Sequence, residues 1–177
     1  MEGHTRKYIR LKKYDYSSNG MYFITICAKN RNHYFSEITE DPQCVGEAAL
    51  GLPNVRLTDI GKIVKNNIIK INDIYKYVSV EKYVIMPDHI HMILFISDYE
   101  TENGGRPGAA SPTNAVIPSL ISVFKRFVNK KTGCNIWQRS YHDHIIRNER
   151  EFLEICNYID NNPINWVNDI YNQNFWR

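Results

Sequence analysis

The feature that most constrains the fold is a pair of segments, 78–86 and 89–97, that are separated only by Pro87-Asp88. Both segments are rich in β-branched and aromatic residues, which predicts two strands, at 78–86 and 89–97. A connection of two residues allows these strands only one arrangement, an antiparallel hairpin. The chain is therefore built around a β-sheet.

Two histidines stand directly after this turn, separated by one apolar residue. Alternate side chains of a strand share a face, so His89 and His91 point the same way while Ile90, Met92 and Leu94 point into a core. This geometry suits two imidazoles that bind one divalent metal. Burying both rings without a ligand would leave nitrogens unsatisfied, at roughly 1 to 3 kcal/mol each. The alternative is a solvated strand face with two surface histidines, and this short segment alone leaves both interpretations open.

Strand and helix signals alternate along the rest of the chain and predict an α+β fold. Further strands are predicted at 21–28, 33–38, 54–57 and 141–147. Helical spacing of apolar residues predicts three helices, which begin after Thr58, at Pro118 and after Asn148. The second helix is expected to end at Gly133. The third is expected to end near Asn162, because Pro163 disfavours helical geometry in the residue before it.

Length and composition are those of one globular domain. The chain has 177 residues, of which 43% are hydrophobic, and we expect a single domain over residues 1–177. The Gly- and Pro-rich segment 98–116 is expected to be a flexible loop. No apolar run approaches the length of a membrane helix, no signal peptide is recognisable and no Cys-x-x-Cys pair occurs, so we expect a cytoplasmic protein without a membrane partner.

Positive charge is unevenly placed, although the net charge is only +3. One cluster lies near the N-terminus and the other on the second predicted helix: Arg6, Lys7, Arg10, Lys12, Lys13, and Lys125, Arg126, Lys130, Lys131. Either cluster is a candidate for contacts with a phosphate backbone, or else an ordinary solvated face. Aromatic residues near the sheet edge offer stacking surfaces for unpaired bases: Tyr8, Tyr14, Tyr16 and Tyr34.

The third helix carries a phenol and an amide on one edge, because Tyr158 and Asn162 are four residues apart. A tyrosine beside a metal-binding histidine pair favours attack by a phenolate on phosphorus. Asn162 offers a neutral oxygen as a third metal ligand, which is compatible with Mg²⁺ or Mn²⁺. Taken alone, a tyrosine on a helix edge such as Tyr158 is more often a residue at the boundary of the core than a nucleophile, and an asparagine before proline is more often a helix stop.

Four segments in this order resemble the REP-associated tyrosine transposases. They are Tyr22-Phe-Ile-Thr-Ile-Cys27, Met86-Pro-Asp-His-Ile-His91, Trp137-Gln-Arg-Ser-Tyr-His-Asp-His-Ile-Ile-Arg147 and Tyr158-Ile-Asp-Asn-Asn-Pro163. The resemblance runs from about residue 6 to 166. These proteins are relatives of the insertion-sequence 200 type transposases within the HUH endonucleases, which are named for His-hydrophobic-His.

The resemblance implies a ferredoxin-like or RRM-like antiparallel sheet covered by helices, the fold of the HUH endonucleases. It implies DNA transposition chemistry on single-stranded or hairpin DNA, such as a REP element, through a covalent 5′-phosphotyrosine. In this sequence His89 and His91 match the HUH pair, Tyr158 the nucleophile and Asn162 the third metal position. His144 is a candidate for orienting the site or contacting phosphate, or a structural histidine. After Trp166 only a short tail, 167–177, remains.

Two other functions fit the same residues. One is a non-catalytic RRM-like nucleic-acid-binding protein derived from a transposase. The other is a metal-dependent phosphodiesterase that uses water in place of Tyr158. Capture of a covalent protein–DNA adduct separates these possibilities, because only the transposase chemistry forms one. We expect a monomer or a homodimer.

Overall fold

The structure is a computed structural model that describes residues 16, 18–39, 53–97 and 116–175, with side chains to residue 168. Its main sheet has four antiparallel strands in the order β4-β5-β1-β6: β1 (Gly20–Cys27), β4 (Val78–Ile85), β5 (His89–Ile96) and β6 (His142–Ile146). A separate ladder joins β2 (Ser36–Thr39) and β3 (Asn54–Leu57). The helices are α1 (Asp59–Ile74), α2 (Val116–Thr132) and α3 (Glu149–Phe175), with a 3-10 turn, η1 (Lys29–Arg31).

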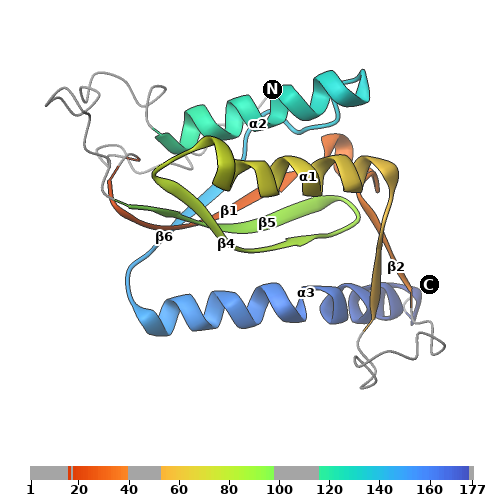
Figure 1. Ribbon diagram of the computed structural model, residues 1–177. Coiled ribbons are helices and arrows are strands. Elements are labelled where there is room, and N and C mark those ends of the chain that lie inside the picture. The colour runs from red at the N-terminus through yellow and green to blue at the C-terminus, as the bar shows by residue number, and fades with distance from the viewer. Residues whose placement is uncertain (1–15, 17, 40–52, 98–115, 176–177) are drawn as a thin grey trace, which may run out of the picture.

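The main sheet has the ferredoxin-like arrangement. Its strands and the first two helices follow one another as β1, α1, β4, β5, α2 and β6, which is a βαββαβ chain with β1 and β5 in the centre. Helices α1 and α2 cover one face of the sheet, and α3 covers the other (Figure 1). The α+β class, the antiparallel sheet and the tight hairpin predicted from the sequence are confirmed.

Strand β5 is buried along nearly its whole length because both faces of the sheet are covered. Ile90, Met92 and Leu94 belong to the main core, which the sheet forms with α1 and α2. Ile93 points the other way and joins Ile159 of α3 in a smaller core. The two histidines share the face of Ile93, so they lie in the layer between the sheet and α3.

The start of α1 is fixed by a cap and by a close backbone approach. Thr58 accepts a hydrogen bond from the Gly61 amide at 3.0 Å, and its own amide donates to the Phe35 carbonyl at 3.1 Å. A Cβ at Gly61 would lie 1.9 Å from that same carbonyl oxygen. Only glycine fits this crossing, so the cap and the glycine together tie α1 to the segment that leads into β2.

The third helix does not end where the sequence predicted. It passes through Pro163 and continues to Phe175, so the expected tail is helical as far as that residue. An interior proline removes one backbone hydrogen bond and costs about 3 kcal/mol. Contacts beyond the proline offset this cost, because Trp166 packs against the rings of His33 and His89. The helix α2 also begins two residues before Pro118, at Val116.

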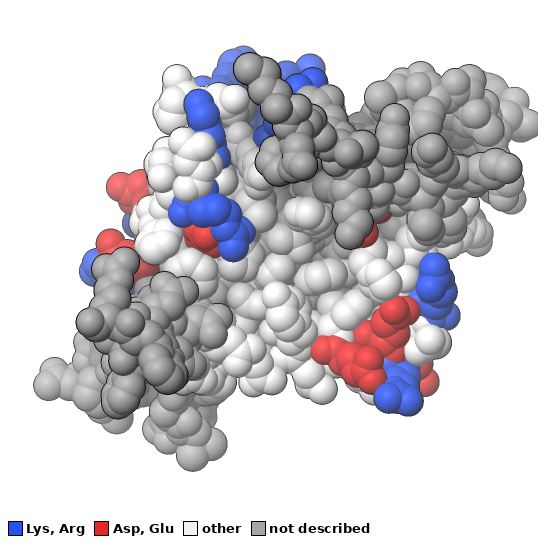
Figure 2. All heavy atoms as spheres, turned by 180° about the vertical axis from the view of Figure 1, so that it is seen from behind, with Lys and Arg blue, Asp and Glu red and all other residues white. Residues whose placement is uncertain are grey.

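Charge is distributed asymmetrically on the face seen in Figure 2. A group of acidic side chains lies where α3 begins, with Glu149 and Glu151 in its first turn, and lysines and arginines line the edge over α2. No described helix is both long enough and apolar enough to cross a bilayer. The predicted flexible loop at 98–116, apart from Val116, and the basic N-terminal residues Arg6, Lys7, Arg10, Lys12 and Lys13 lie outside the described part of the chain.

Candidate active site

A row of polar side chains crosses the sheet beneath α3. In the strand register, Thr25 of β1 stands between His91 of β5 and His142 of β6, and Cys27 stands opposite His89. All of these side chains point to the α3 face and line one cleft of about 840 Å³. The prediction that the two histidines share a face is confirmed, with their ring centroids 4.6 Å apart. The alternative of a solvated face is wrong, since His89 and His91 are 7% and 4% exposed.

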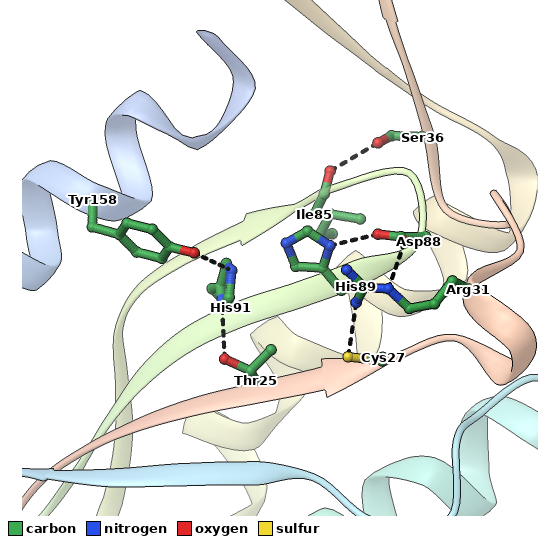
Figure 3. Close-up of polar contacts among 9 residues, drawn as sticks. All are labelled: Thr25, Cys27, Arg31, Ser36, Ile85, Asp88, His89, His91 and Tyr158. Atoms are coloured by element: carbon green, nitrogen blue, oxygen red, sulfur yellow. Dashed lines mark hydrogen bonds and ion pairs between the residues drawn. The ribbon is translucent and has the colours of Figure 1, made fainter. Parts of the chain in front are cut away.

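His89 is oriented by a buried carboxylate from the hairpin turn. Its Nδ1 lies 2.6 Å from Asp88 Oδ1, and the second oxygen of Asp88 lies 2.9 Å from Nε of Arg31 (Figure 3). Burial alone would raise the pKa of Asp88, but the hydrogen bond and charge of His89 and the charges of Arg31 and His33 lower it. An ionised carboxylate only accepts, so Nδ1 of His89 donates, and Nε2 carries the lone pair when the imidazole is neutral.

His91 is held in the same way by a hydroxyl. Its Nδ1 lies 2.8 Å from Oγ1 of Thr25, and its ring stacks on Phe23 with centroids 5.1 Å apart. Burial, reinforced by the neighbouring His89 and Arg31, lowers the pKa of His91 to about 3. The ring is therefore neutral at physiological pH. When Nδ1 donates to Thr25, Nε2 is left as the atom that faces the cleft with a lone pair.

Helix α3 brings a phenol to these rings. The Tyr158 hydroxyl lies 3.4 Å from Nε2 of His91, and its ring meets Phe23 edge-on (Figure 3). The side chain remains 46% exposed, so an incoming group can reach its oxygen. An ion pair of 2.7 Å between Lys82 of β4 and Asp160 of α3 ties the helix to the sheet near this point. The predicted approach of Tyr158 to the histidine pair is confirmed as geometry.

Asn162 and Trp166 complete the wall of the cleft. They follow Tyr158 at four-residue intervals and therefore lie on the same side of α3. Asn162 is only 7% exposed although its side chain is polar. The continuation of the helix beyond Pro163 is what places Trp166 against His89, with ring centroids 6.1 Å apart.

The donor set fits a divalent cation. Each histidine has one ring nitrogen occupied by a protein partner, Asp88 or Thr25, and the other available, which is the arrangement that fixes the tautomer of metal-binding histidines. Asn162 contributes an amide to the same cleft. No group of three or more His, Cys, Asp or Glu ligands occurs among the described residues, so a metal would be held by the two imidazoles, this amide and groups of the substrate or water.

Comparison with known proteins gives the family. The chain is 35% identical to an uncharacterized protein of Haemophilus influenzae over 94% of its own length and 92% of that protein. A solved structure titled as a REP-associated tyrosine transposase bound to a REP hairpin shares the fold, with a TM-score of 0.51 and 20% identity over 93% of this chain and 74% of that one. A second Haemophilus influenzae protein, named “Putative REP-associated tyrosine transposase”, is 22% identical over 85% of this chain and 73% of its own. The chain belongs to one family with the first of these Haemophilus influenzae proteins, and it resembles the REP-associated tyrosine transposases in sequence and fold. No protein-family model matches the sequence.

The sequence singled out four residues as metal ligands and nucleophile. The structure brings all four to one cleft: His89, His91, Tyr158 and Asn162. His144 does not join them. Its Nε2 lies 2.6 Å from Oε1 of Glu151, whose other oxygen accepts from the amide of Arg147. His144 of β6 thus contacts the first turn of α3 and helps to anchor that helix to the sheet.

The exposed basic residues of α2 lie away from Tyr158, because α2 covers the opposite face of the sheet (Figure 1). Lys125 is partly buried and donates to the carbonyls of Gln138 and Ser140, both at 2.8 Å, and burial lowers its pKa to about 8. Arg126, Lys130 and Lys131 are exposed. Among the proposed stacking residues, Tyr16 is wrong, because it is 3% exposed within the core. Tyr8 and Tyr14 lie outside the described residues.

Several residues of the Tyr158 cleft were not predicted from the sequence: Thr25, Cys27, Arg31, Gln138, His142 and Trp166. Asp88, which contacts the cleft residue His89, was not predicted either. Asp88 carries a usable local signal, since it directly precedes the histidine pair. The others become neighbours only through strand register, the η1 turn, the path of the segment before β6 and the position of α3, and single-sequence patterns do not encode these.

Proposed function

We propose that the protein is a metal-dependent single-stranded DNA endonuclease and strand transferase that forms a covalent 5′-phosphotyrosine at Tyr158. The observation that carries this proposal is the 3.4 Å separation between the Tyr158 hydroxyl and Nε2 of a neutral, buried His91. Similarity to a protein named as a putative REP-associated tyrosine transposase supports the class of reaction. The solved transposase structure that shares this fold is of a complex with a REP hairpin. We therefore propose hairpin-forming DNA as the substrate of this protein.

In the proposed reaction, the Tyr158 oxygen attacks the scissile phosphate as its proton leaves. The new O–P bond replaces the bond from phosphorus to the 3′ oxygen, which takes up a proton and departs as a free 3′-hydroxyl. Attack by a 3′-hydroxyl on the phosphotyrosine reverses the sequence and joins strands without an external energy source. A bound Mg²⁺ or Mn²⁺ would withdraw charge from the phosphate.

The residues around the nucleophile have separable tasks in this proposal. His89 and His91 hold the metal with Asn162, and Asp88 and Thr25 hold the two imidazoles in the required tautomers. Phe23 positions the tyrosine ring by edge-on contact and the His91 ring by stacking. The metal is Mg²⁺ or Mn²⁺ under cellular conditions, although two imidazoles also favour Ni²⁺ or Zn²⁺ in a purified sample.

End-labelled DNA tests the proposal directly. Single-stranded oligonucleotides that form hairpins, labelled at the 3′ or the 5′ end, are incubated with Mn²⁺ and separated on a denaturing protein gel. The 3′ label is expected to move with the protein, and the 5′ label is expected in a shorter free fragment. Tyr158→Phe removes one oxygen and should abolish both products, whereas Tyr83→Phe, on the opposite face of the sheet, should not.

Each alternative function gives its own result in this assay. Cleavage without adduct, retained in Tyr158→Phe, would indicate a phosphodiesterase that uses water. Binding without cleavage would indicate a nucleic-acid-binding protein. Adduct that survives in Tyr158→Phe would mean that another tyrosine is the nucleophile. Cleavage that is equally fast after treatment with a chelator would remove the metal from the mechanism.

A further inference from the structure

A second cleft, of about 660 Å³, adjoins the one that holds Tyr158. Its walls come from the η1 turn, the segment that precedes β6, and α2. Two residues, Arg31 and Gln138, line both clefts, so the two form one continuous depression. We refer to the second as the basic cleft, because its lining includes Lys29, Arg31, Lys125 and Arg139 and no aspartate or glutamate.

Two of these cations are not paired with a carboxylate of any described residue. Within the described part of the chain, Lys29 and Arg139 are exposed and make no ion pair, whereas Lys62, Lys82 and Arg150 are each paired with an acidic side chain. Lys125 is engaged by two backbone carbonyls of the cleft wall, so it holds that wall in place. The positive charge that faces solvent therefore comes mainly from Lys29, Arg31 and Arg139.

The floor of the basic cleft is rigid. Backbone hydrogen bonds join its two sides, from the Lys29 amide to the Ile136 carbonyl at 2.8 Å and from the Gln138 amide to the Cys27 carbonyl at 2.9 Å. Asn30 and Arg31 both adopt left-handed backbone angles, with φ of 56° and 55°. Such residues cost about 1 to 2 kcal/mol each and persist where the surroundings impose them, often at ligand-binding turns.

Arg31 connects the two clefts electrostatically. Its guanidinium contacts Asp88 and the sulfur of Cys27, yet its side chain is still 56% exposed. A polyanion that enters from the basic cleft meets Arg31 before it reaches the histidine pair. The exposed amides of Asn30 and Gln138 border the same path and can bond to base edges or sugar oxygens.

We propose that the basic cleft binds the backbone of the single-stranded DNA that adjoins the scissile phosphate, with Lys29 and Arg139 as phosphate contacts. This inference rests on the proposed function of the Tyr158 cleft. It assigns the DNA path to the η1 turn and the segment before β6, and not to the outer surface of α2 with Arg126, Lys130 and Lys131. Charge complementarity and continuity with the Tyr158 cleft carry it.

The test measures how binding of a fluorescent oligothymidine depends on salt. Each phosphate contact on a single strand contributes about 0.7 to the slope of log affinity against log salt concentration. The double variant Lys29→Ala/Arg139→Ala is expected to reduce that slope by about 1.4. The matched pair Lys130→Ala/Lys131→Ala removes the same charge from the last turn of α2 and should leave the slope nearly unchanged.

All variants carry Tyr158→Phe so that cleavage does not interfere, and their melting temperatures establish that they are folded. Equal slopes in the two pairs, or no binding of oligothymidine by the parent, would overturn the inference. A larger effect of the α2 pair would place the strand on α2 and would also overturn it. Adduct formation is assayed separately in the wild type, which keeps Tyr158. If the slope depends on Lys29 and Arg139 but the wild type never forms an adduct, the proposed function alone is refuted. If the wild type forms the adduct but the slope is unchanged in Lys29→Ala/Arg139→Ala, this inference alone is refuted.

Discussion

The Asp88 carboxylate connects the proposed metal site to the proposed DNA path. One oxygen accepts from Nδ1 of His89 and the other contacts Arg31, and the whole side chain is 4% exposed. A carboxylate in this position raises the basicity of the imidazole and fixes its orientation. In the proposed function, Asp88 would therefore act on the metal through His89 without touching it.

Replacing Asp88 by asparagine should weaken metal binding by about 10- to 100-fold, because the neutral amide keeps the shape but loses the charge that supports His89. Isothermal titration with Mn²⁺ measures this change. Glu151→Gln is the matched control, since it removes a carboxylate from His144 outside the cleft. Equal affinities for Mn²⁺ in the Asp88→Asn variant and the wild type would contradict the role given to Asp88.

The pKa of His91 predicts a specific acid sensitivity in metal-free protein. The folded value is about 3 and the unfolded value 6.5, so between these pH values the unfolded state binds the extra proton. Stability should fall as the pH is lowered through this window, by about 2 kcal/mol between pH 7 and pH 4.5. Urea unfolding in the presence of a chelator measures this, and the His91→Gln profile should be flatter than that of the wild type. Parallel profiles would mean that His91 is not buried as a neutral ring.

The histidine pair was predictable because strand periodicity alone decides which side chains share a face. Thr25 and Arg31 were not, for different reasons. Thr25 meets His91 only through the register between β1 and β5, which a single sequence does not encode. Arg31 reaches Asp88 only because two successive residues take left-handed angles, and neither of them is a glycine that would signal such a turn.

At the level of the elements, the crossing between α1 and the segment before β2 has the least spare room. The Phe35 carbonyl accepts from the Thr58 amide and lies where a Cβ on Gly61 would be. Gly61→Ala must displace the helix or this carbonyl, and overpacking of this kind costs typically 1 to 3 kcal/mol. Chemical denaturation should therefore show a loss of that size, whereas Lys65→Ala on the exposed face of α1 should be nearly neutral. A stable Gly61→Ala variant would contradict the packing described.

The local sequence predicts the start of helix α3 but not its end. Its start was predictable, since the Glu151 amide bonds to the Asn148 side chain at 2.9 Å as the capping pattern indicates. Its end was not, because Pro163 is a stop signal in isolation and the contacts that override it come from elsewhere in the chain. The ring of Trp166 packs on His33 and His89, which are more than 70 residues away in sequence.

Across the whole molecule, the two faces of the sheet differ: one face packs in the main core, and the other carries the candidate active site. The main core lies between the sheet and the pair α1 and α2, while the face under α3 has a smaller apolar cluster and the polar row of the cleft. The ferredoxin-like order was predictable because the hairpin, the helix spacing and the strand signals agreed with one another and with the family resemblance. The position of α3 followed from the resemblance and not from periodicity, since nothing local indicates which face of the sheet a terminal helix covers.

This division predicts that metal binding joins two layers of the molecule. His89 and His91 belong to the sheet and Asn162 to α3, so a cation held by all three ties the helix to the sheet. At a Mn²⁺ concentration about 100 times the dissociation constant, the wild type should gain about 2.7 kcal/mol of stability. At that same Mn²⁺ concentration Asn162→Ala should gain less, and His89→Ala/His91→Ala should gain nothing. Asn157→Ala removes the same side chain from an exposed position on α3 outside the cleft and should gain as much as the wild type. Thermal unfolding with and without Mn²⁺ gives these values, and an equal gain in Asn162→Ala and the wild type would show that the metal is held by the sheet alone.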